Sequence, residues 1–90
     1  MTEEFSEDKI NTIESNAGFV VELKFGGGII FKDSRGSMAI DGEWLVNPRR
    51  MVVYSRKLDK FGSEYVSEVL DKVVRALRFK GIESEIDDLT

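Results

Sequence analysis

The chain has 90 residues, of which 17 are acidic and 13 basic, and it contains neither histidine nor cysteine. It therefore lacks the usual general acid and base near neutral pH, the activated thiolate and the common zinc ligands. No cofactor and no enzymatic activity are expected. One small domain, residues 1–90, is expected to act through its surface.

The first 17 residues are predicted to form a short helix or an N-terminal arm. Ser6 is a candidate N-cap, Phe5 could pack on Ile10 as a hydrophobic staple, and Glu7 and Asp8 suit a first helical turn. Few apolar residues follow, so both alternatives stay open. This acidic start has no signal-peptide pattern, and no apolar run reaches membrane-span length. A cytoplasmic protein without membrane contact is expected.

Residues 18–62 are predicted to form a β-meander. Phe19, Val21 and Leu23 recur at every second position, which is the period of a half-buried strand. Three glycines at 26–28 interrupt the run. Because an extended apolar segment follows them instead of a helix, they predict a turn or bulge and not a phosphate-binding loop.

Further turn signals divide the meander into strands. Residues 33–36, Asp-Ser-Arg-Gly, predict a hairpin turn, and Asp41-Gly42 predicts a second turn. Asn47-Pro48 ends the following segment, because proline cannot donate to a ladder. Residues 51–54 are predicted to be one more strand.

The clearest helix is predicted over residues 63–80, where apolar side chains recur at spacings of three and four. Gly81 is the expected stop, and residues 82–86 alternate as a final strand with an acidic outward face. The predicted fold is α+β, an antiparallel sheet of four to six strands with this long amphipathic helix packed on one face. The apolar stripe consists of Tyr65, Val66, Val69, Leu70, Val73, Val74 and Leu77.

A basic middle segment lies between acidic ends of the chain. It suggests one alternative function, a small nucleic-acid-binding module using residues 49–60 with Tyr54 or Phe61 as a stacking surface. The simpler interpretation is that these basic side chains are ordinary solvated residues of strand ends and loops, since a net charge of −4 would repel a polyanion. No nucleic-acid partner is therefore expected. The basic residues are Arg35, Arg49, Arg50, Arg56, Lys57 and Lys60.

Asp41 and Glu43 are two residues apart and can share a strand face. A third interpretation is a metal-dependent enzyme in which this pair binds Mg²⁺ or acts as acid and base. In a chain without histidine, a turn residue or a contact to a basic partner is preferred, so no metal or catalytic residue is assigned. Trp44, the sole tryptophan, is either a core residue or an interface anchor, and the same holds for Tyr54.

Three segments carry a resemblance to a known family. Residues 28–43, with their hairpin and Gly-Glu turn, residues 53–61 and residues 81–86 resemble small α+β immunity proteins of bacterial polymorphic-toxin and contact-dependent inhibition systems. The resemblance implies an antitoxin that binds one cognate toxin domain, with basic nucleases among the candidates, and blocks it by direct protein contact.

For such a partner, the expected contact residues are acidic or aromatic. An acidic inhibitor would associate quickly with a basic toxin through electrostatic steering. The oligomeric state stays open, since a free strand edge could pair with another copy. The expected partner-binding residues are Asp41, Glu43, Trp44, Tyr54, Glu83, Glu85, Asp87 and Asp88.

Overall fold

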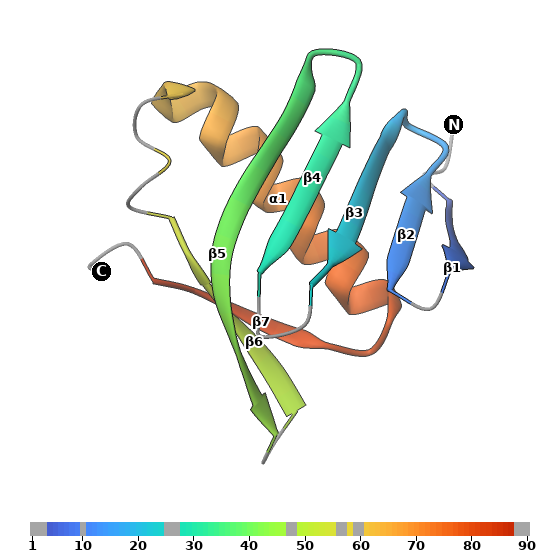
Figure 1. The fold of residues 1–90 in the computed structure, drawn as a ribbon, viewed down its shortest axis with the longest axis vertical. Helices are drawn as coiled ribbons and strands as arrows, with labels where there is room; N and C mark the ends of the chain where they lie inside the picture. Colours follow the sequence, from blue (N-terminus) through green and yellow to red (C-terminus); the bar gives the residue numbers. More distant parts are fainter. Residues whose placement is uncertain are drawn as a thin grey trace.

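The computed structural model contains one seven-stranded sheet and one long helix (Figure 1). It describes residues 4–9, 11–24, 28–46, 49–55, 58 and 61–87. The strands are β1 (Phe5–Lys9), β2 (Thr12–Ser15), β3 (Phe19–Leu23), β4 (Ile29–Asp33), β5 (Gly36–Val46), β6 (Arg49–Tyr54) and β7 (Glu83–Asp87), and the helix is α1 (Ser63–Phe79).

The strands lie in the sheet in the same order as in the chain, from β1 to β7. Every neighbouring pair is antiparallel except β6 and β7, which are parallel because α1 connects them across the sheet. The prediction of an α+β fold with one helix on one face is confirmed. The prediction of an antiparallel sheet of four to six strands is wrong, since the sheet is mixed and has seven.

The two strands that were not predicted come from the N-terminal segment. Residues 5–9 and 12–15 form the hairpin β1–β2, where a short helix or an arm was expected. The hairpin is held by tertiary contacts: Ile13 is fully buried, and the Phe5 ring lies 6.0 Å from Phe19 and 5.7 Å from Phe79. These contacts outweigh the local helix signals, which are weak in so short a segment. Ile10, the expected staple partner of Phe5, lies outside the described residues.

β5 is the longest strand and joins the two halves of the sheet. Its residues 36–40 pair with β4, and its residues 41–46 pair with β6. The turn expected at Asp41-Gly42 is therefore absent, and Gly42 lies inside the strand where pairing passes from β4 to β6. Glycine suits such a place because the strand can bend there without a side chain. The hairpin turn before β5 is found at residues 34–35, followed by Gly36 at φ 131°.

The core lies between the inner face of the curled sheet and α1. Alternate residues of β3 and β4 point inward, as the two-residue period predicted, and the apolar stripe of α1 covers them, with Val69, Val73 and Leu77 fully buried. Figure 1 shows α1 lying diagonally behind β2 to β5. The sheet residues of the core are Ile13, Phe19, Val21, Leu23, Ile29, Phe31, Met38, Ile40, Met51 and Val53.

A Schellman motif ends α1 and directs the chain into β7. The Ile82 N–H donates to the Leu77 carbonyl at 3.0 Å, and the Gly81 N–H donates to the Arg78 carbonyl at 2.9 Å. Gly81 has φ 75°, a conformation that favours glycine. Ile82 is buried and starts the return of the chain alongside β6.

Candidate partner-binding face

Side-chain alternation separates two faces in the β5–β7 half of the sheet. Met51 and Val53 are fully buried on the inner face toward α1, so Arg50, Val52 and Tyr54 lie on the opposite, outer face. Paired residues of neighbouring strands share a face. The register therefore determines which side chains of β5 and β7 surround those three residues.

That register forms three rows across the outer face. Each row takes one residue from β5, one from β6 and one from β7, and neighbouring strands are about 4.8 Å apart. Five of the nine positions are carboxylates, and one is a guanidinium; we call this surface the acidic face. The rows are Asp41–Tyr54–Asp87, Glu43–Val52–Glu85 and Leu45–Arg50–Glu83.

Tyr54 lies at the centre of the row Asp41–Tyr54–Asp87 and is hydrogen-bonded to Glu43 of the next row. Its hydroxyl donates a hydrogen bond of 2.7 Å to Oε2 of Glu43. This bond raises the pKa of the Tyr54 phenol, and partial desolvation and the negative charges of Glu43 and Asp87 raise that pKa further. Tyr54 thus reports the negative potential of the acidic face.

In the other half of the same outer face, a described carboxylate lies among cations. Glu22 on β3 lies 2.9 Å from the Lys24 ammonium and 3.4 Å from that of Lys32, and these cations lower the pKa of its carboxyl. On the acidic face the only cation within the three rows is Arg50, whose Nε has no hydrogen-bond partner among the described residues. Among the described residues, the carboxylates of the acidic face therefore outnumber its cations, whereas Glu22 has two lysines beside it.

The structure brings together five of the eight residues expected to bind a partner around a shared centre. Asp41, Glu43, Tyr54, Glu85 and Asp87 occupy two adjacent rows. Glu83 lies on the same face in the third row, beside Arg50. These residues come from three strands, and only the strand register reveals that they are neighbours.

Two expected contact residues are not part of this face. Trp44 pairs with Met51 and so points to the inner face, where it is half-buried and packs against the core. This is the core alternative of the sequence analysis. Asp88 lies outside the described residues.

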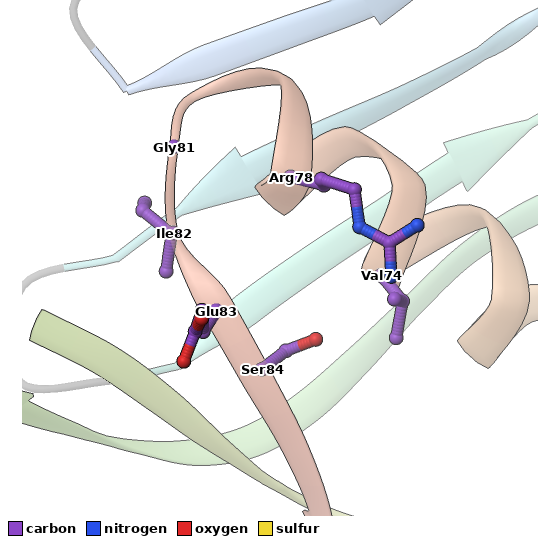
Figure 2. A pocket seen from close by; sticks show the side chains of 6 residues that line it. All are labelled: Val74, Arg78, Gly81, Ile82, Glu83 and Ser84. Carbon is purple, nitrogen blue, oxygen red and sulfur yellow. The ribbon is translucent and has the colours of Figure 1, made fainter.

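The described carboxylates form no cluster that could hold a metal ion. Asp41 and Glu43 share a face, as their spacing predicted, but no three potential ligands in the described part of the chain are placed to hold a metal ion. A hollow of about 500 Å³ lies elsewhere, between the end of α1 and the start of β7 (Figure 2). The side chains of the acidic pair do not line it.

Arg35, one of the basic residues considered for nucleic-acid contact, has a structural role. Its guanidinium donates to the Asp33 carboxylate at 2.6 Å and to Glu68 of α1, and it lies 4.3 Å from the Tyr65 ring centroid. The β4–β5 turn is thereby fastened to the helix. Of the basic 49–60 segment, Arg56, Lys57 and Lys60 lie outside the described residues, and the side chain of Arg49 is also not described.

The sequence analysis missed two features of this region. The Arg35–Glu68 contact joins residues 33 positions apart, and no local pattern signals it. The hollow beside β7 also depends on tertiary structure, although the four-residue spacing of Val74 and Arg78 already placed these two side chains on one helix face.

Comparisons with protein-family models, with curated proteins and with solved structures give no significant match. No helix in the described part of the chain has the length and apolar character needed to cross a membrane.

Proposed function

We propose that this chain is an immunity protein that binds a basic bacterial toxin domain through the acidic face and neutralises it by direct contact, in the cytoplasm and without chemistry of its own. The observation that carries the proposal is the strand register, which gathers carboxylates of β5 and β7 around Tyr54. The resemblance of residues 28–43, 53–61 and 81–86 to immunity proteins supports the same function.

The energetics of the face also favour a basic partner. Glu83, Glu85 and Asp87 occupy alternate positions on the outer face of β7, and these like charges repel one another, so keeping them together costs stability in the free protein. A partner that presents lysine and arginine would relieve the repulsion on binding and would be steered toward the face. An acidic surface can also occupy the positions that nucleic-acid phosphates take on a nuclease.

The proposal is tested by charge reversal on β7. Glu83→Lys combined with Glu85→Lys should slow association with the toxin domain encoded beside this gene by about tenfold or more at low salt, because attraction is replaced by repulsion. The difference should shrink as salt rises. Association rates of parent and variant at both salt concentrations provide the measurement.

A matched control places the same charge change elsewhere. Glu14→Lys combined with Glu64→Lys reverses two exposed carboxylates of β2 and α1, away from the β5–β7 rows. This control should associate nearly as fast as the parent. Equal slowing in both variants would show that net charge alone matters, and unchanged association in the β7 variant would rule out the acidic face as the docking surface.

A further inference from the structure

β7 is an edge strand whose outer edge has no main-chain partner among the described residues. The Asp87 carbonyl accepts a 3.0 Å hydrogen bond from the Ser55 N–H, so the main-chain groups of Asp87 face β6. Main-chain groups of successive strand residues point to opposite edges. The N–H and C=O groups of Ser84 and Ile86 therefore point away from β6, where a further strand would lie.

A hollow borders the first residues of β7. The hollow of about 500 Å³ lies between the end of α1 and this strand, with Val74 and Arg78 on the helix side. Figure 2 shows Ser84 directed toward that helix side and Glu83 directed away from it. Ile86, two residues after Ser84 and on the same face, is 44% exposed although it is a large apolar residue. The edge is therefore accessible and partly apolar.

We propose that the open edge of β7 receives an extended segment of the protein partner, which adds to the sheet as an eighth strand and carries basic side chains alternating with apolar ones. This inference rests on the proposed function, because it takes the partner to be a basic protein. Main-chain hydrogen bonds to Ser84 and Ile86 would supply affinity, and the alternating side chains would supply selectivity.

The two faces of β7 define that alternation. Side chains of the added strand on the inner face would meet Val74, Ile82 and Ile86, which favours apolar residues. Side chains on the outer face would lie beside Glu83, Glu85 and Asp87, which favours lysine or arginine. Opposite charges on directly neighbouring strands stabilise a pair, and like charges destabilise it.

The same charges argue against a second copy of this chain at the edge. Two β7 strands paired edge to edge would place their carboxylates side by side on one continuous outer face. Acidic side chains on an edge strand are a known protection against such self-pairing. The occupant that fits is a basic segment.

The test uses a seven-residue peptide in which lysine alternates with valine, added to the full-length protein labelled for NMR. Amide hydrogen exchange at Ser84 and Ile86 should slow at least tenfold when the peptide binds, because their N–H groups become hydrogen-bonded. A peptide in which glutamate alternates with valine should not slow this exchange. Unchanged exchange at both amides with the lysine peptide bound would overturn the inference.

A proline substitution separates edge pairing from simple charge attraction. Ile86→Pro removes an N–H that faces away from β6, so the β6–β7 ladder can persist. It should weaken peptide binding at least tenfold, while Ile86→Ala, which keeps the N–H, should bind more tightly than the proline variant. A folded proline variant that binds as well as the alanine variant would overturn the inference. Loss of binding by the Glu83→Lys, Glu85→Lys variant would then still support the acidic face.

The oligomeric state provides a separate outcome. Light scattering of the parent protein should show a monomer at the concentrations used for binding. A dimer that Ile86→Pro dissociates would assign the edge to a second copy and would overturn the proposed occupant, without bearing on charge-dependent association with the toxin domain.

Discussion

At the scale of single residues, Tyr54 reports most directly on the acidic face. Its raised pKa has the Glu43 hydrogen bond as its main cause. Glu43→Gln should therefore lower the Tyr54 pKa toward the ordinary value of about 10. A pH titration followed by NMR of labelled tyrosine rings provides the measurement.

Glu85→Gln is the matched control, because Glu85 lies in the neighbouring row and its charge is not among the causes of the Tyr54 shift. It should lower the Tyr54 pKa less than Glu43→Gln does. Because the folded chain holds the phenolic proton more tightly, the stabilisation is present below about pH 10 and is lost as pH rises through the folded-state pKa. A larger effect from the control would contradict this assignment.

A second prediction at this scale concerns Arg35 and the stability of the fold in acid. Its guanidinium is the main cause of the lowered pKa of both Asp33 and Glu68. Carboxyls with lowered folded-state pKa values stabilise the fold above their unfolded pKa, and this stabilisation is lost as pH falls through the folded-state value. In Arg35→Met, the free energy of unfolding should therefore fall less between about pH 6 and about pH 3 than in the parent.

Urea unfolding at the two pH values measures this difference. Arg78→Met is a suitable control. Like Arg35, Arg78 is an exposed arginine, but it lies in α1, and its removal keeps the contacts of Arg35 with Asp33 and Glu68. The control should retain the pH dependence of the parent. If Arg35→Met also retained it, the fastening of the β4–β5 turn to α1 would not depend on these charges.

At the scale of elements, the packing of α1 is tested by one substitution at two positions. Leu77→Ala removes a fully buried side chain and should lower the free energy of unfolding by about 2–5 kcal/mol. Leu70→Ala, seven residues earlier on a half-buried position, should cost about 1 kcal/mol. Denaturant unfolding compares the two, and equal losses would show that Leu70 is packed as tightly against the sheet as Leu77.

The elements differ in how well the sequence predicts them. α1 and the strands from Phe19 to Asp33 follow their periodicity closely, because each buries one regular apolar face. The β1–β2 hairpin was missed because its stability comes from Phe5, Phe19 and Phe79, which meet only in the folded chain. The turn predicted at Asp41-Gly42 was wrong because pairing on both sides keeps β5 extended through it.

The candidate site, too, could be predicted only in part from the sequence. Composition and alternation already indicated acidic residues at Glu83, Glu85 and Asp41. Their arrangement around Tyr54 depends on the parallel pairing of β6 with β7, which follows a connection of nearly thirty residues. Trp44 was ambiguous from sequence alone, and the side of the strand on which it lies depends on the register with Met51.

At the scale of the whole molecule, the distribution of charge predicts how the chain meets nucleic acid. DNA or RNA should bind no more tightly than about weak micromolar at physiological salt, because the acidic face and the net charge of −4 oppose it. Fluorescence anisotropy with labelled single and double strands provides the measurement. Nanomolar, salt-sensitive binding that is lost when Arg49, Arg50, Arg56 and Lys57 become alanine would assign the function to the basic segment.

The parallel pairing of β7 with β6 has a consequence for the order in which the chain folds. Strands β1 to β6 each pair with the strand next in sequence, so they can form through short, fast loop closures. β7 pairs with β6 across a long connection that contains α1, and a pairing over so long a separation is the slower kind of closure. We therefore expect the chain to gain its compact core before β7 completes the acidic face, so that the proposed ability to capture a partner would arrive with the final step of folding.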